Sequence, residues 1–220
     1  KQKTAYEIYQ CDWSSDVCSS DLHVQIGALD SVPKYITKEI LLDAYKIRDC
    51  MVSVLEGEGD MLLRELTSHK IDLLLSNYPP SVDFQTVYAK SVAKVDVVVC
   101  ASEKFKHLKK NFPHSLSGQP FVFPTRHSKL RRDIDHFFEV KGIKVDCVAE
   151  TQDTSLQNLL GTEGVGLIPI AEFPARELVK EKKLLVLGKL PGVYEETWLM
   201  AANRKIENPV AARLMKEFSL

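Results

Sequence analysis

The chain has 220 residues, 45% of them hydrophobic, so it is long enough to bury a sizeable core. Its 29 basic residues nearly balance its 30 acidic residues, and this argues against DNA binding by this part of the chain, because such binding needs a clustered basic surface. No apolar run approaches the roughly 18 residues of a membrane span, which predicts a protein that does not enter a membrane.

Residues 1–22 differ from the remainder of the chain. Cys11 and Cys18 have neither the CxxC spacing nor the nearby histidine of a typical zinc site, and no apolar stretch marks an export signal that would favour a disulfide. Residues 12–22 resemble the translation of a short-read sequencing adapter, and residues 1–7 resemble its flow-cell end. We therefore expect residues 1–22 to be a non-native, disordered leader; a natural disordered leader is the alternative.

From residue 23, short apolar runs alternate with amphipathic segments, which predicts an α/β fold. Asp30 or Ser31 is the expected cap of the first helix, with Pro33 in its first turn. The order strand, helix, strand, helix, strand implies a parallel sheet. The expected strands are at 23–29, 50–57 and 71–77, and the expected helices run from 30 to about 46 and from 59 to 70.

After residue 79, two strand-like runs follow each other with no helix between them, and a second α/β unit comes next. Thr154 and Gln157 predict a capping box at the start of one of its helices. The chain closes with a helix from Pro209 that has apolar residues on one side. The expected strands are at 86–93, 95–102, 120–125, 144–150, 165–170, 183–188 and 197–203, and the expected helices at 105–119 (short, with a loop), 128–140, 154–164 and in the Lys/Glu-rich segment near 175.

Three segments carry a family resemblance. EGEGDMLLRELTSHKIDLLLSN, at 56–77, resembles the effector-domain pattern of LysR-type transcriptional regulators, in which EG precedes a Leu-rich helix and a strand. TSLQNLLGTEGVGLIPIAEF, at 154–173, is similar to the helix, Gly-x-Gly turn and strand of the family, and NPVAARLMKEF, at 208–218, resembles its terminal helix. The resemblance spans residues 23 to 220.

The resemblance implies a type 2 periplasmic-binding-protein-like fold, with two Rossmann-like lobes joined by two crossover segments and a small effector between the lobes. The implied boundaries are 23–79 for lobe I, 80–200 for lobe II with the crossovers, and 201–220 for a C-terminal helix that returns to lobe I. Family members carry an N-terminal winged helix-turn-helix, which we expect to be missing from this chain, so that DNA is bound only through that missing domain. The family also implies homo-oligomers, with effector domains paired antiparallel and a tetramer of the full-length protein.

Within the family, residues 123–146 and 195–214 look most like regulators of sodium/proton antiporter genes. This implies a transcriptional activator that responds to sodium and pH. Sodium is a hard cation that takes several oxygen ligands, and Glu58 and Asp60 offer carboxylates. Because EG at this place is common to the family whatever the effector, these two are weak candidates. No cofactor and no other metal site is expected.

The candidate effector site is a set of loops. In open α/β sheets, ligands bind beyond the carboxyl ends of the strands, where helices begin. Effector sites of the family occupy matching loops. For Asp30, Asp60 and Ser128 the alternative role is a helix cap. The candidates that this rule selects are Asp30, Ser31, Glu58, Asp60, Ser76, Asn77, Thr125, Arg126, His127, Ser128, Gln152 and Asp153.

Basic residues gather just before and within the expected helix at 128–140. Arg126, His127, Lys129, Arg131 and Arg132 together could hold an anion, since Arg offers a bidentate fork. The alternative is a solvated helix face, which is favoured for Lys129 and Arg132. Arg126 or His127 remains the candidate for a role in the cleft.

Enzyme motifs do not emerge from the sequence. The turn at Gly164 and Gly166 lacks the third glycine and the following helix of a dinucleotide loop, and no GxSxG, HExxH or P-loop occurs. Cys50, Cys100 and Cys147 lie in apolar segments, which is typical of reduced, buried thiols in a cytoplasmic protein. The favoured hypothesis is therefore an effector-sensing domain in the cytoplasm. The alternative is an extracytoplasmic solute-binding protein of the same two-lobed fold, which would require a signal peptide.

Overall fold

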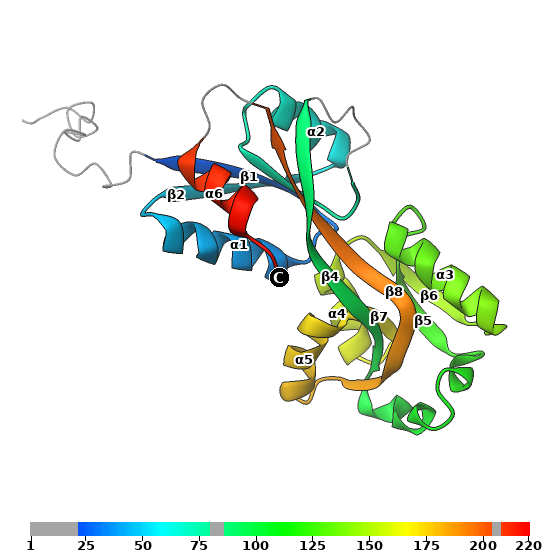
Figure 1. Ribbon diagram of the computed structural model, residues 1–220. Coiled ribbons are helices and arrows are strands. Elements are labelled where there is room, and N and C mark those ends of the chain that lie inside the picture. The colour runs from blue at the N-terminus through cyan, green and yellow to red at the C-terminus, as the bar shows by residue number, and fades with distance from the viewer. Residues whose placement is uncertain (1–21, 80–85, 204–207) are drawn as a thin grey trace, which may run out of the picture.

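The computed structural model describes residues 22–79, 86–203 and 208–220 (Figure 1). Apart from Leu22, the expected leader lies outside the described residues. Two lobes are joined by a pair of long strands, β4 and β8, which run through both (Figure 1). The predicted two-lobed α/β architecture with two crossover segments is therefore confirmed.

Lobe I is a parallel α/β unit, as predicted. Strand β1 pairs in parallel with β2 on one side and with β3 on the other. The strands end at the same edge of the sheet, so the loops that follow them lie together. The elements are β1 (His23–Leu29), α1 (Lys34–Ile47), β2 (Met51–Gly57), α2 (Gly59–Thr67) and β3 (Leu73–Ser76).

The crossover segments correct the prediction. The structure has two long strands, β4 (Val87–Ala101) and β8 (Leu185–Ala202), which pair antiparallel. They replace the four shorter strands expected at 86–93, 95–102, 183–188 and 197–203. The pairing continues through shifts in register, the largest of which leaves residues 190–193 of β8 bulged opposite Val97. Gly192, with φ of 86°, lies in this bulge. Pattern breaks that resemble strand ends are therefore bulges inside continuous strands.

Lobe II repeats the α/β plan. Strands β5 and β6 pair in parallel, while β7 pairs antiparallel with β4. The segment expected as a short helix and loop forms two 3₁₀ helices, η1 (Glu103–Lys109) and η2 (His114–Leu116). The other elements are β5 (Pro120–Pro124), α3 (Lys129–Lys141), β6 (Asp146–Thr151), α4 (Thr154–Thr162), β7 (Ile168–Ala171) and α5 (Glu172–Lys180).

The cores divide between the lobes along the crossover strands. Val87, Val92 and Leu199 belong to the core of lobe I, whereas Val97 and Leu187 belong to a core of lobe II. The lobe boundary expected at residue 80 follows chain order, but each crossover strand supplies core residues to both lobes. Any movement of one lobe against the other must therefore bend β4 and β8.

The C-terminal helix α6 (Pro209–Glu217) returns to lobe I and contacts α1. Asn208 caps it by accepting hydrogen bonds from the amides of Val210 and Ala211. Val210, Leu214 and Phe218 are buried, as the sequence predicts. Among the described residues, no helix has both the length and the apolarity to cross a membrane.

Two predicted helix starts are wrong. Helix α1 begins at Lys34 with Pro33 at the cap position, so neither Asp30 nor Ser31 caps it. Helix α4 is capped by Asp153, whose Oδ1 accepts from the amide of Ser155 at 2.7 Å.

Gln157 therefore closes no capping box. It is buried, and its Nε2 donates to the carbonyls of Val122 and Pro169, which joins α4 to β5 and β7. Cys147 also departs from expectation, because it is exposed whereas Cys50 and Cys100 are buried.

Candidate functional site

A cavity of about 460 Å³ lies between the lobes. Its walls come from the loops after β1, β2 and β3 in lobe I and after β5 and β6 in lobe II. Strand β7, the start of α5 and residues 194–196 of the crossover strand β8 complete the walls. The starts of α1, α3 and α4 also line it. A ligand in this cavity would touch both lobes and one of the strands that join them.

The lobe I wall contains four of the six candidates predicted there. Asp30, Ser31, Glu58 and Asn77 line the cavity. Nδ2 of Asn77 donates to Oγ of Ser31 at 2.9 Å, so the ends of β1 and β3 are linked across the sheet.

The other two lobe I candidates do not line the cavity. Asp60 lies in the first turn of α2, where Glu58 occupies the cap position, and its side chain is exposed. Ser76 is buried, and its Oγ donates to the carbonyl of Tyr78 at 2.8 Å. Its role is to hold the turn after β3.

In lobe II, Thr125, His127, Ser128 and Gln152 line the cavity, whereas Arg126 and Asp153 do not. Ser128 also caps α3, its Oγ accepting from the amide of Arg131 at 3.0 Å, so the alternative role predicted for it is confirmed. Arg126 is exposed and its Nε lies 3.4 Å from Glu150. Of the proposed pair Arg126 and His127, only His127 faces the cleft.

Several lining residues were not selected by the loop rule. Tyr35 is in the first turn of α1, and Tyr194, Glu195 and Glu196 lie within β8. The rule considers strand ends only, whereas these β8 residues lie in the middle of a strand that passes between the lobes. The sequence feature that could have indicated these β8 residues is the pair of glutamates, Glu195 and Glu196, before an apolar segment.

Cations on the cavity wall already have acceptors. Nζ of Lys34 lies 2.5 Å from Glu56, and Nζ of Lys129 lies 2.7 Å from Asp133. Arg132 donates to the carbonyl of His127 at 3.0 Å. These contacts agree with the interpretation of Lys129 and Arg132 as part of a solvated helix face. Both residues also line the cavity.

Carboxylates on the same wall are less well paired. Glu196 accepts from Oγ of Ser91 at 3.2 Å. Glu195 is half-buried and, within the described part of the chain, has no hydrogen bond or ion pair. Burial raises the pKa of its carboxyl to about 7. Burial and the charge of Glu195 together also raise the pKa of Tyr35.

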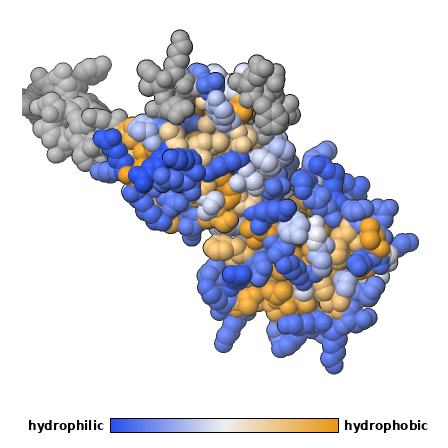
Figure 2. Space-filling view, viewed as in Figure 1, coloured by the Kyte–Doolittle hydropathy of each residue, from blue (hydrophilic) through white to orange (hydrophobic). Residues whose placement is uncertain are grey.

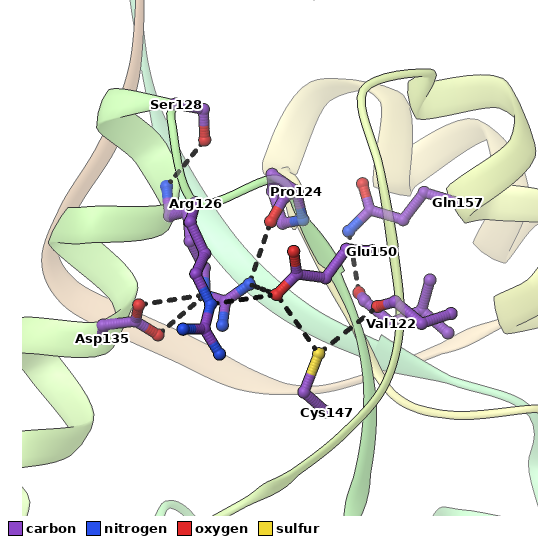
Figure 3. A network of polar contacts seen from close by, with 10 residues as sticks. Val122, Pro124, Arg126, Ser128, Asp135, Cys147, Glu150 and Gln157 are labelled. Carbon is purple, nitrogen blue, oxygen red and sulfur yellow. Dashed lines mark hydrogen bonds and ion pairs between the residues drawn. The ribbon is translucent and has the colours of Figure 1, made fainter.

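The buried Arg131 forms the polar centre of lobe II behind the cavity wall. Its Nε donates to both carboxylate oxygens of Asp135, at 2.8 and 3.0 Å, and its Nη1 donates to Glu150 at 2.9 Å and to the Pro124 carbonyl at 3.1 Å. The Arg131 hydrogen bond lowers the pKa of Glu150. Figure 3 shows Glu150 between this network and Cys147, whose Sγ lies 3.6 Å from it. Arg131 therefore joins β5, α3 and β6 and is not available to a ligand.

Glu195 gives a pH prediction for the ligand-free domain. Its pKa is raised from 4.5 to about 7, so the fold favours the protonated form. The stabilisation of the folded state that comes from protonation of Glu195 is fully present below about pH 4.5 and is lost as the pH rises through 7. We expect the difference in melting temperature between Glu195→Gln and wild type to increase in favour of the variant from about pH 5 to about pH 8. Glu196→Gln is the control. The prediction would be contradicted if the melting temperatures of wild type and Glu195→Gln changed by the same amount across this pH range.

Comparison with known proteins identifies the family. A model described as the LysR substrate binding domain matches residues 21–219. The transcriptional activator protein NhaR of Escherichia coli (strain K12) is 23% identical over 197 residues, which cover 89% of this chain and 65% of NhaR. NhaR of Shigella flexneri matches to the same extent. The chain thus spans 65% of the length of these curated relatives.

Solved structures share the fold at low identity. The effector binding domain of QuiR in complex with shikimate has a TM-score of 0.62 and 16% identity, covering 89% of this chain and 94% of that domain. Full-length CbnR complexed with its target DNA has a TM-score of 0.72 and 13% identity, covering 91% of this chain and 70% of CbnR. Because the family model matches nearly the whole described chain, the protein belongs to the LysR substrate-binding domain family, the effector-binding regulatory domains of LysR-type transcription regulators.

Proposed function

We propose that this chain is the sensing part of a transcriptional activator that responds to sodium and pH and controls a sodium/proton antiporter gene. The observation that carries effector sensing is the cavity shared by both lobes. The antiporter assignment is supported by the similarity to NhaR along 89% of the chain. In this proposal DNA is bound by a winged helix-turn-helix outside this chain, and the whole regulator works in the cytoplasm.

The proposed mechanism is a shift between lobe arrangements. An effector that contacts both walls of the cavity favours the more closed arrangement by the difference in its affinity for the two states. Because β4 and β8 belong to both cores, closure changes their bend and the surfaces of both lobes together. DNA-binding domains attached to paired effector domains would respond to that change.

The sodium proposal concerns the cleft as a whole and not the pair Glu58 and Asp60. Glu58 lines the cavity and Asp60 does not, so the two carboxylates do not converge there. The described residues contain no group of three His, Cys, Asp or Glu side chains that could hold a metal ion. A sodium ion in the cavity would therefore take neutral oxygens of the wall and water as most of its ligands.

Two exposed apolar strips support the proposed homodimer. In lobe I the strip consists of α1 and the edge strand β2, with Leu42, Tyr45, Met51, Val54 and Leu55 exposed.

In lobe II the strip consists of α4, the outer strand β6 and the turn after α4, with Val148, Leu156, Leu159 and Val165 exposed. Figure 2 shows apolar surface in the region of α4 and α5, and further apolar surface on lobe I. An antiparallel two-fold pairing would place the lobe I strip of each subunit against the lobe II strip of its partner. Two such dimers would form the full-length tetramer.

A melting experiment tests the sodium proposal. We expect NaCl to raise the melting temperature of the chain more than KCl at equal ionic strength, because a ligand that binds only the folded state stabilises it. The measurement is a titration by differential scanning fluorimetry at two pH values. Equal responses to the two salts at both pH values would remove direct sodium sensing by this domain.

A further inference from the structure

Three oxygen-bearing side chains on the cavity wall lack partners. Glu195 has no hydrogen bond or ion pair in the described part of the chain. The hydroxyl of Tyr35 and Oδ1 of Asn77 are shielded from water and make no hydrogen bond there. Leaving a buried polar atom unpaired is costly, so such atoms in a cavity indicate where a ligand supplies the missing partner.

Local contacts hold these groups in place without satisfying them. The hydrogen bond from Asn77 to Ser31 uses the amide nitrogen and leaves Oδ1 of Asn77 unpaired. The ring of Tyr35 in α1 lies against the ring of Phe173 in α5, with centroids 4.9 Å apart. This contact joins lobe I to lobe II. Glu195 reaches the same cavity from β8, and its charge acts on Tyr35.

The charge of the cavity favours a cation at this place. Lys34 and Lys129 are each neutralised by a carboxylate, Glu56 and Asp133 respectively. No cation of the described residues pairs with Glu195. A ligand that brings a positive group would supply the counter-ion that this carboxylate lacks, and charge-assisted hydrogen bonds of this kind are the strong ones.

We propose that Glu195, Asn77 and Tyr35 form a subsite for the protonated primary amine of a small organic effector. An ammonium group has three N–H donors, and the subsite offers three acceptors: a carboxylate, an amide oxygen and a phenol oxygen. A sodium ion needs more oxygens than these side chains provide. The inference rests on the proposed binding of an effector in the cleft, and it adds a second ligand class, an organic amine, to the sodium proposed above.

The test compares two organic cations of equal charge, methylammonium with three N–H donors and the larger tetramethylammonium with none. Melting of the chain is followed with methylammonium chloride, tetramethylammonium chloride and NaCl at equal ionic strength, near pH 8, where Glu195 is ionised. We expect methylammonium to raise the melting temperature and tetramethylammonium not to do so. Glu195→Gln should weaken the apparent affinity for methylammonium by about tenfold or more. Glu103→Gln, which removes a carboxylate of η1 that pairs with Lys106 and does not line the cavity, should leave it unchanged.

Tyr35→Phe provides a second variant, which removes the unpaired hydroxyl and keeps the contact with Phe173. It should fold as well as wild type and bind methylammonium more weakly.

Equal shifts with the two organic cations, or an undiminished response in Glu195→Gln, would overturn the amine subsite. A shift with NaCl alone would overturn it while supporting the sodium proposal, and a shift with methylammonium alone would do the reverse.

Discussion

Replacing Arg131 with alanine is expected to lower the free energy of unfolding by about 3 kcal/mol. The side chain is only 5% exposed, donates to Asp135, Glu150 and the Pro124 carbonyl, and stacks on Phe123 with its guanidinium carbon 4.3 Å from the ring centroid. Its loss leaves two carboxylates without their shared cation and a cavity beside an aromatic ring. The measurement is urea denaturation followed by circular dichroism.

Arg132→Ala is the matched control for that variant. Arg132 is the next residue of α3 and donates to a backbone carbonyl on the exposed surface, so its removal should change the free energy of unfolding by less than about 0.5 kcal/mol. Equal urea midpoints for the two variants would mean that the Arg131 network does not stabilise lobe II.

Replacing Leu159 with aspartate is expected to convert the proposed dimer into monomers. Leu159 is 63% exposed on α4 and lies within the apolar strip of lobe II. In the proposed pairing it is buried against α1 and β2 of the partner, where a carboxylate would lose its hydration without gaining a counter-ion. Sedimentation velocity over a range of protein concentrations measures the change.

Val140→Asp is the control for the dimer prediction. Val140 is similarly exposed, at 67%, but belongs to the end of α3, outside both strips. This variant should sediment as wild type. A wild-type chain that stays monomeric at high concentration, or a Leu159→Asp variant that stays dimeric, would contradict the proposed interface.

Local patterns predicted most of the fold because the lobes are built from regular parallel units. The strand at 23–29 and the three buried side chains of the C-terminal helix, Val210, Leu214 and Phe218, follow from hydrophobic periodicity. The crossover strands were not predictable in this way. Their continuity across the bulge at 190–193 depends on pairing between segments about a hundred residues apart.

The site was predicted in part for the same physical reason. Ser31, Asn77 and His127 lie where strands end, and all three line the cavity. Arg131 was grouped with possible anion ligands because its position in sequence does not reveal that it turns inward to Asp135 and Glu150. Glu195 was missed because it lies in the middle of a strand, and only the packing of two lobes makes that strand a cavity wall.

The most direct test of effector sensing in the cleft is hydrogen–deuterium exchange of the chain in NaCl and KCl at matched ionic strength. We expect slower exchange in NaCl at cavity segments of both lobes together, around residues 29–35 and 124–132, because a ligand in the cavity contacts both walls. Protection confined to one lobe, or the same exchange in both salts at every cavity segment, would contradict sodium sensing between the lobes.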